Sequence, residues 1–386
     1  MRRARAPALP GRHLLISEQD ASDAGSEPVA GDWEVAGRAS RGDFVASPYP
    51  PTVMTHRIPP GTRDILPDEM RELRRLQGAL ADVFERFGYG EVATPTIEYH
   101  DVLARGDERG APAAYRFFDE DGALLAMRTD MTVPIARLVS TRLRDSQPPF
   151  RLCYIGNAYR AIRPQRGQMR QFLQAGVELI GVDAPEGTSD VIEVLAAALN
   201  AIGLTRAVIG LGDADLYGQL LAEHGVSGDA RESILRVLAR HDLVGLEAAV
   251  GQLDIGEGER ETLLRLPNLR GGPEVLDRAR ELGGAAVDRA IQRLATTYEA
   301  LAPEVAERVQ LDLGLLRDLG YYTGAIVEVY DPALGHILGG GGRYDDLLGR
   351  FGRAMPAAGF GLYLERIHLA QMEEERLAQD DGEGKR

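Results

Sequence analysis

Apolar residues recur at steps of three or four along the segment that begins near residue 67. Pro67 is suited to the first turn of a helix, and Gly88 is suited to the position after its last turn. The spacing therefore predicts a helix with a single apolar face. The apolar residues of this helix are Met70, Leu73, Leu76, Leu80, Val83 and Phe87.

Strand patterns follow this helix. Residues 91–98 predict one strand, which we place at a sheet edge or an interface because Pro95 has no N–H for a ladder hydrogen bond. A hairpin is predicted around residues 119–122, where an Asp-Glu-Asp-Gly turn separates two apolar runs. Two longer strands are expected at residues 150–159 and 171–182, with an arginine-rich loop between them.

Between residues 185 and 303 the pattern changes to short amphipathic helices separated by Gly and Pro. One strand is predicted within this stretch, at residues 207–212. The predicted helices cover residues 188–202, 214–224, 228–241, 243–251, 257–265, 273–282 and 285–300.

Strand patterns return after residue 303, and a helix follows them. Strands are predicted at residues 309–313, 321–330 and 336–338, and the helix at 361–378. The four glycines at 339–342 predict either a tight turn or a ligand loop. Taken together, these elements predict an α+β sheet domain that is interrupted by a helical insertion.

The expected domain boundaries follow from these changes of pattern. Residues 1–53 mix small, polar and charged residues without an apolar period. We expect them to form a disordered N-terminal extension that is dispensable or results from the choice of start site. The other expected parts are a core segment at 54–184, the helical insertion at 185–303, a second core segment at 304–378 and a disordered tail at 379–386.

Composition narrows the range of partners. The chain has 386 residues, and 44 Lys and Arg against 59 Asp and Glu give a formal net charge of −15. Nucleic acid is not expected as a main partner, because binding a phosphate backbone needs clustered cations. The single cysteine, Cys153, excludes an internal disulfide and multi-cysteine metal sites. No apolar run approaches the ~20 residues of a membrane-spanning helix, so we expect a cytoplasmic protein with no membrane partner.

Motifs of several enzyme classes are absent from the sequence. It contains no G-x-x-x-x-G-K-[ST] phosphate loop, no G-x-S-x-G nucleophile elbow and no H-E-x-x-H metal helix. The seven histidines are scattered without ligand spacing, and each is expected to be a surface or core residue. These absences narrow the possible chemistry, and the motifs searched for predict no catalytic residue, no metal and no cofactor.

Three segments together favour a pocket for a small zwitterion. The first is the strand at 171–182, in which Gln174, Gly176 and Glu178 share one face. A carboxylate and an amide on either side of a bare glycine leave room for a ligand. A half-exposed strand whose polar residues face water is an equal alternative at this stage.

The other two segments supply complementary charges. Asp130 and Thr132 are suited to receive an ammonium group, although the same residue types also cap helices and turns. Arg317 precedes Tyr321 and Tyr322 and is suited to hold a carboxylate in its planar fork. Jointly, the three segments fit an amino acid.

Several long motifs in a fixed order resemble one known family. About 310 residues, from Ile58 to Ile367, resemble the catalytic domain of histidyl-tRNA synthetase, a class II fold with an antiparallel sheet flanked by helices. Motif 1 implies self-association through the class II dimer interface. The matching segments are motif 1 near Thr94 and Pro95, motif 2 at 159–178, motif 3 at 359–366, and the histidine-recognition segments at 317–324 and 341–345.

Departures from the synthetase pattern concern the nucleotide. The resemblance is closer to the non-aminoacylating members of the family, which are regulatory subunits of ATP phosphoribosyltransferase. Where the synthetases have a glutamate at the adenine side of ATP, this chain has Ile162, which accepts no hydrogen bond. Gln168 replaces a basic residue, Leu173 a histidine and Gly320 an aspartate, whereas Arg366 is retained. The resemblance thus implies a vestigial nucleotide site at Ile162, Gln168 and Arg366.

The positions that the family uses for histidine are largely matched, with Asp130 as a shorter stand-in for a glutamate. The resemblance implies that Glu178, Asp130 and Thr132 act on the amino group or the ring nitrogens. Arginines and Gln174 would lie nearer the carboxylate, and tyrosines would frame the imidazole. The implied histidine-binding residues are Asp130, Thr132, Arg160, Gln174, Glu178, Arg317, Tyr321, Tyr322 and Tyr344.

The resemblance implies a non-catalytic regulatory subunit. Such a subunit joins short-form catalytic subunits in a hetero-oligomer, commonly four and four, makes them active in the first step of histidine biosynthesis, and conveys feedback inhibition by L-histidine. About twenty residues follow motif 3, where the synthetases carry an anticodon-reading domain, so tRNA charging is not expected. Two alternatives remain: a divergent histidine-activating ligase that forms histidyl adenylate, and a structural dimerisation scaffold with a vestigial pocket.

Overall fold

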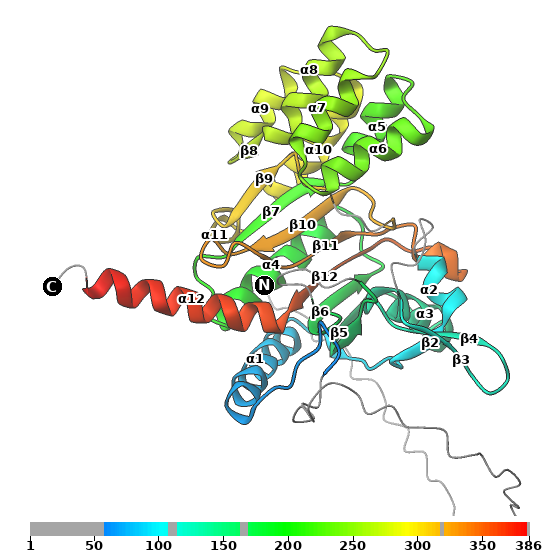
Figure 1. The fold of residues 1–386 in the computed structure, drawn as a ribbon, viewed down its shortest axis with the longest axis vertical. Coiled ribbons are helices and arrows are strands. Elements are labelled where there is room, and N and C mark those ends of the chain that lie inside the picture. The colour runs from blue at the N-terminus through cyan, green and yellow to red at the C-terminus, as the bar shows by residue number, and fades with distance from the viewer. Residues whose placement is uncertain (1–57, 107–113, 163–168, 317–319, 384–386) are drawn as a thin grey trace, which may run out of the picture. The chain divides into compact units, whose positions relative to one another are not determined.

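The computed structural model describes residues 58–106, 114–162, 169–316 and 320–383, with side chains up to Leu377 (Figure 1). These residues belong to one compact unit, Arg57–Arg386. The expectations for residues 1–53, and those for Gln168 and Arg317, lie outside the described residues.

Two sheets carry the fold in the part of the chain that the structure describes. The large sheet has nine strands in the order β1-β5-β6-β12-β11-β10-β7-β9-β8, and the small sheet has the order β2-β4-β3. In the large sheet only β1 with β5 and β7 with β9 pair in parallel, so the expected antiparallel α+β architecture is confirmed. The strands are β1 (Gly90–Glu91), β2 (Ile97–Tyr99), β3 (Arg116–Phe118), β4 (Leu124–Met127), β5 (Phe150–Tyr159), β6 (Gln171–Ile180), β7 (Val208–Asp213), β8 (Arg270–Gly271), β9 (Val309–Asp312), β10 (Ala325–Tyr330), β11 (Ile337–Arg343) and β12 (Ala357–Tyr363).

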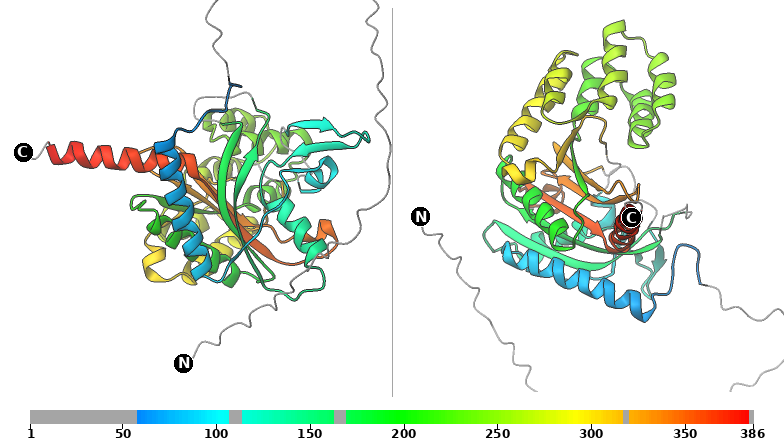
Figure 2. Two further views of the ribbon diagram at one scale, coloured as in Figure 1. Left: turned by 90° about the horizontal axis from the view of Figure 1, so that it is seen from below. Right: turned by 90° about the vertical axis from the view of Figure 1, so that its left-hand side faces the viewer.

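Helices cover one face of the large sheet. α1, α4 and α12 pack against β6, and α4 and α12 also pack against β12 (Figures 1 and 2). The apolar side chains of this layer, among them Val177 and Phe360, form one buried core with the helices. The helices are α1 (Pro67–Arg86), α2 (His100–Gly106), α3 (Thr132–Arg142), α4 (Glu186–Ala201), α5 (Leu216–Glu223), α6 (Gly228–Ala239), α7 (Leu243–Gly251), α8 (Glu257–Arg265), α9 (Glu274–Arg280), α10 (Ala285–Glu299), α11 (Pro303–Ala306) and α12 (Leu364–Glu383), with short 3-10 turns η1 (Leu266–Asn268) and η2 (Leu348–Phe351).

The predicted first helix is confirmed in detail. α1 starts at Pro67, with acidic residues in its first turn that complement the helix dipole. Leu73, Leu76 and Leu80 are buried, as the spacing predicts. Gly88 adopts a φ of 80°, a left-handed conformation that suits glycine and ends the helix.

The helical segment after residue 185 also follows its pattern. Each predicted helix there has a counterpart among α4 to α10, and the predicted strand at 207–212 is β7. β7 lies inside the large sheet, between β10 and β9. The segment is therefore joined to the sheet by a paired strand, while its domain boundaries remain a prediction.

The strand predicted at 91–98 is wrong as a continuous element. β1 and β2 divide it, and they lie at edges of different sheets, so only the expected edge position is right. The physical reason lies in the linking segment: the Arg128 guanidinium donates to the carbonyl oxygen of Thr94 at 2.6 Å, and Pro95 has no N–H for a ladder. The predicted hairpin, by contrast, is present as β3 and β4.

The glycine run and its neighbours also correct the sequence analysis. Residues 339–342 form neither a turn nor a loop but the middle of β11, paired with β10 and β12. A Cβ on Gly341 would lie 1.9 Å from the carbonyl oxygen of Gly359, so only glycine fits this close backbone approach. Residues 361–363 belong to β12, and the last helix runs instead from Leu364 to Glu383. The strand predicted from 321 begins only at Ala325.

Candidate functional site

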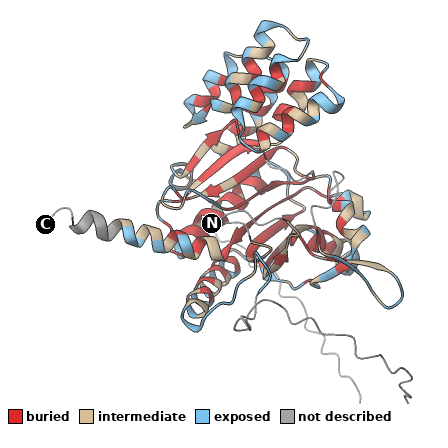
Figure 3. Ribbon diagram, in the orientation of Figure 1, coloured by how far each residue is buried: buried red, intermediate tan, exposed pale blue. Residues whose placement is uncertain are grey.

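The strand β6 carries the centre of the candidate site. Ala175 and Val177 belong to the helix-covered core, so Gln174, Gly176 and Glu178 face the other side of the sheet. These three residues are buried, and the strand appears buried over this stretch in Figure 3. This excludes the alternative of polar residues turned toward water.

Two hydroxyl groups donate to the Glu178 carboxyl group. Thr132, the first residue of α3, donates from Oγ1 to Oε1 at 2.8 Å, and the Tyr344 hydroxyl donates to Oε2. Glu178 is 1% exposed. The other charged group that acts on it is the Asp130 carboxylate, so among the described residues no cation balances Glu178.

Burial raises the pKa of Glu178 to about 8. The hydrogen bonds from Tyr344 and Thr132 oppose the shift, whereas the nearby Asp130 carboxylate adds to it. Near neutral pH the unoccupied site therefore favours the neutral form of Glu178. A cationic ligand would reverse this balance, because an adjacent positive charge favours the carboxylate.

Glycines on β12 make the space for these side chains. Gly359 pairs with Glu178, and Gly361 pairs with Gly176. A Cβ on Gly359 would lie 1.9 Å from Glu178 Oε2, and a Cβ on Gly361 would lie 2.0 Å from Gln174 Nε2. The floor of the site is thus bare backbone. The sequence analysis missed this feature, although the two glycines at alternate positions, Gly359 and Gly361, could have indicated it.

Three tyrosines form an aromatic cluster at the Glu178 end. Tyr321 and Tyr344 are buried, and their rings meet edge to face with centroids 6.0 Å apart. The ring centroid of Tyr322 lies 4.9 Å from that of Tyr321. A fourth, Tyr154 of β5, faces Gly176 across the strand pair and was not predicted. Pairing of the two predicted strands, which sets Tyr154 opposite Gly176, was the signal that could have identified this tyrosine.

Gln174 and Asp130 differ in whether their side-chain oxygens have hydrogen-bond partners within the fold. Gln174 Oε1 is buried without a hydrogen-bond partner among the described residues, which is costly unless a ligand supplies a donor. Asp130 Oδ1 accepts from the backbone N–H of Val133 at 3.0 Å, at the start of α3. The helix-capping role considered for Asp130 is therefore real, while its carboxylate still acts on Glu178.

A second group lies farther along the same face. Phe172 shares this face of β6, six residues before Glu178, or about 20 Å at ~3.3 Å per residue. The Arg160 guanidinium stands 4.9 Å from the centre of the Phe172 ring. The structure thus places Arg160 with this group, although the resemblance implied a place beside the histidine carboxylate; that role remains a prediction.

Arg366 completes the second group. Its guanidinium lies 4.8 Å from the centre of the Tyr363 ring and donates to the carbonyl oxygen of Ile337 at 2.6 Å. Arg160, Arg366 and Ile162 line one cavity of about 250 Å³. The residues expected for a vestigial nucleotide site are therefore grouped, apart from Gln168, which lies outside the described residues.

Known proteins share this architecture. Residues 61–367 match the histidyl-tRNA synthetase family. The chain belongs to this family. The relatives of this chain include proteins named ATP phosphoribosyltransferase regulatory subunit. The one from Desulforamulus reducens is 41% identical over 317 residues, which are 81% of this chain and 79% of the relative. The one from Symbiobacterium thermophilum is 40% identical over 330 residues, or 84% and 82%.

A solved structure places the chain in the same part of the histidyl-tRNA synthetase family. The Bacillus halodurans protein described as an ATP phosphoribosyltransferase regulatory subunit/histidyl-tRNA synthetase superposes with a TM-score of 0.75 at 32% identity, over 83% of this chain and 84% of that one. The chain is thus a member of the regulatory-subunit branch, as its sequence motifs indicated.

The described residues contain neither a membrane-spanning helix nor a cluster of metal-binding side chains. None of their helices has both the length and the apolar content needed to cross a membrane. They also bring together no three His, Cys, Asp or Glu side chains that could hold a metal ion.

Proposed function

We propose that the chain serves as the cytoplasmic regulatory subunit of an ATP phosphoribosyltransferase and binds L-histidine at the Glu178 site. One observation carries the ligand assignment: among the described residues, no cation balances the buried Glu178 carboxyl group, and the Gln174 amide oxygen on the same strand face has no hydrogen-bond donor. The names of the relatives support the regulatory assignment.

The chemistry of the site favours a cationic amino acid with an aromatic ring. One N–H donor of histidine, on its ammonium group or its ring, would donate to Glu178, and another would satisfy Gln174 Oε1. The tyrosine cluster offers aromatic rings and hydroxyl groups against which an imidazole can pack. We assign the histidine carboxylate to Arg317, with Arg160 as the second candidate on the side of Phe172.

Histidine can regulate the activity of the complex if it binds one state of the complex more tightly than the other. A ligand shifts an equilibrium only by its differential affinity for the two states, and a coupling of about 1–3 kcal/mol is typical. Glu178 connects β6 to the start of α3 through Thr132 and to the segment after β11 through Tyr344. Occupancy of the site therefore acts on three elements that are remote in sequence.

We further propose that the chain does not activate histidine. Ile162 offers no acceptor for an adenine amino group, which argues against a productive nucleotide pose. Arg160, Arg366 and their shared cavity support the alternative of a histidine-activating ligase. Histidine-dependent ATP–pyrophosphate exchange separates the two, because a ligase shows exchange and a regulatory subunit shows none.

The proposed partners are short-form catalytic subunits and a second copy of the chain. Self-association is expected near motif 1, where Ile97 and Tyr99 of β2 are 47% and 56% exposed. Large exposed apolar side chains on an edge strand favour an interface.

Reconstitution with a short-form catalytic subunit tests the proposal. Mixing should raise phosphoribosyltransferase activity, and histidine should inhibit the mixture. Glu178→Gln should keep the activation but lose histidine inhibition, while Glu91→Gln, an exposed glutamate on β1, should behave as wild type. Histidine binding to Glu178→Gln at wild-type affinity would exclude the site, and efficient charging of tRNA by the purified chain would exclude the function.

A further inference from the structure

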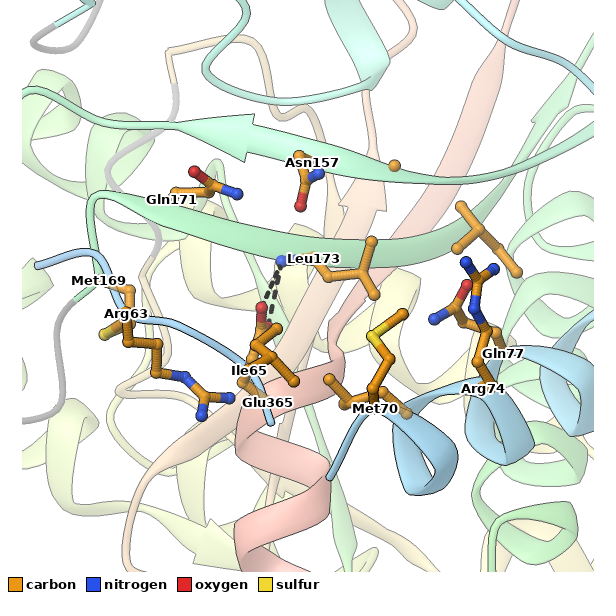
Figure 4. Close-up of a pocket in the computed structure, with 13 residues that line it drawn as sticks. Arg63, Ile65, Met70, Arg74, Gln77, Asn157, Met169, Gln171, Leu173 and Glu365 are labelled. Carbon is orange, nitrogen blue, oxygen red and sulfur yellow. Dashed lines mark hydrogen bonds between the residues drawn. The ribbon is translucent and has the colours of Figure 1, made fainter. Parts of the chain in front are cut away.

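A separate cavity of about 330 Å³ lies on the helix-covered face of the sheet, between α1, the β5–β6 pair and the start of α12 (Figure 4). We call it the α1 cavity. Asn157 and Leu173 pair across β5 and β6, and they point away from the face that carries Glu178. The cavity is lined by Arg63, Ile65, Met70, Leu73, Arg74, Gln77, Ile155, Gly156, Asn157, Met169, Gln171, Leu173 and Glu365.

α1 brings an uncompensated cation to this cavity. Met70, Arg74 and Gln77 lie on one side of the helix at steps of four and three. The neighbouring Arg71 and Arg75 pair with acids of their own helix. Arg74 has no hydrogen bond or ion pair among the described residues, so its charge is available at the cavity wall.

Three carboxamides lie around the same space. Figure 4 shows Asn157 and Gln171 on adjacent strands and Gln77 beside Arg74 on the helix side. None of these side-chain amides hydrogen-bonds to another described residue. Each offers two donors and one acceptor oxygen, so together they can bind the polar edge of a ligand from several sides.

The acid in the cavity does not cancel the Arg74 charge. Both carboxyl oxygens of Glu365 accept from the backbone N–H of Leu173, at 2.9 and 3.1 Å. Burial raises the pKa of Glu365. The other cation, Arg63, is paired with Glu69. The remaining free charge in the cavity is therefore positive.

We propose that the α1 cavity binds a small organic anion, a carboxylate or phosphate attached to a body with an apolar surface and a hydrogen-bonding edge. Arg74 holds the anionic group, the carboxamides hold the edge, and Met70, Ile155 and Leu173 supply the apolar wall. The volume falls at the lower end of the range for small-molecule sites. The site lies on the opposite face of the sheet from Glu178 and does not depend on histidine binding.

Titration of the full chain with benzoate and with phenyl phosphate tests this site, with ligand-observed NMR as the readout. We expect saturable binding of at least one probe, and preference between the two tells a carboxylate ligand from a phosphate one. Arg74→Gln should weaken binding about tenfold, and Asn157→Ala about threefold. Arg75→Gln removes the same charge one residue away, outside the cavity, and should leave binding unchanged.

Three results would overturn the proposal. In the first, neither probe shows saturable binding. In the second, Arg75→Gln weakens binding as much as Arg74→Gln, which would indicate general electrostatic attraction to the surface. In the third, Arg74→Gln would change the association state in light scattering, which would mean that another copy of the chain covers the cavity. Unchanged histidine binding in Arg74→Gln would show that the variant is folded and would leave the Glu178 site unaffected.

Discussion

The two ends of one face of β6 differ in kind. At the Glu178 end a buried acid is held by two hydroxyls and surrounded by tyrosines. At the Phe172 end, two arginines stack on aromatic rings beside an isoleucine. The first arrangement suits a cation and the second an anion, although the same strand carries both.

The two ends of this β6 face also differ in how tightly the fold fixes the positions of their side chains. Glu178 is fixed through contacts from three elements and through a glycine partner that leaves no spare volume. The arginines of the Phe172 end, Arg160 and Arg366, are themselves only partly buried. We therefore expect substitutions to be tolerated more readily at the Phe172 end, where the partly buried Ile162 lines the cavity.

Filling the glycine floor should have the largest effect. In Gly359→Ala the new Cβ would lie 1.9 Å from Glu178 Oε2 and 2.5 Å from the Val177 carbonyl oxygen. We expect histidine affinity to fall more than ~100-fold and the free energy of unfolding to fall by about 1–3 kcal/mol. Calorimetry and urea denaturation measure these quantities.

The matched control is Gly349→Ala, whose Cβ would meet Ala354 at an ordinary 3.6 Å. Its affinity should equal that of wild type, and its stability should change by less than about 0.5 kcal/mol. Normal histidine binding by Gly359→Ala would show that the ligand does not need Glu178 in its observed position.

Removing the acid should come next in size. Glu178→Gln keeps the shape but cannot become an anion, so we expect an affinity loss of about 30-fold, or ~2 kcal/mol. Since burial favours the neutral acid in the empty site, binding of a cation to the wild type should release more protons than binding to the variant. Calorimetry in buffers of different ionisation enthalpy measures this difference, and equal proton release would contradict a carboxylate–cation contact.

The same carboxyl group should also make stability depend on pH. The folded-state pKa of Glu178 is about 8, against an ordinary value of 4.5, so the folded protein holds the proton through this window and the unfolded chain does not. This group therefore lowers the free energy of unfolding as pH rises from about 4.5 to 8, by up to about 1.4 kcal/mol per pH unit. Denaturation of wild type and Glu178→Gln at several pH values should show the two curves diverging, and parallel curves would refute the raised pKa.

The contrast between the two ends also marks what the sequence could predict. Alternation placed Gln174 and Glu178 on one face, and helical spacing located α1 almost to the residue. Pattern analysis failed where close backbone approach outweighs local propensity. Glycine has a weak preference for strands, yet the glycines of β11 form a central strand paired with β10 and β12. Glycine is needed there because the neighbouring strands leave no room for a Cβ.

Long-range contacts account for the other misses. Tyr154 enters the site through its register opposite Gly176, and the split of the strand at 91–98 depends on Arg128, more than thirty residues away. Neither is encoded by nearby residues. The α1 cavity was likewise not predicted, because its polar groups come from α1 and the segment before it, from β5 and β6, and from α12, and only the fold brings these together.

The smallest effect is expected at the Phe172 end. Arg366→Gln removes the cation that stacks on Tyr363 and donates to the Ile337 carbonyl oxygen, and should cost about 0.5–1 kcal/mol of stability. Histidine affinity should change less than about twofold, because Tyr363 is four positions along β12 from Gly359, the partner of Glu178. Arg376→Gln, on the same helix but outside the cavity, is the control for loss of charge. A tenfold loss of histidine binding in Arg366→Gln alone would mean that the two ends act as one site, and that the separation between amino-acid and nucleotide residues must be abandoned.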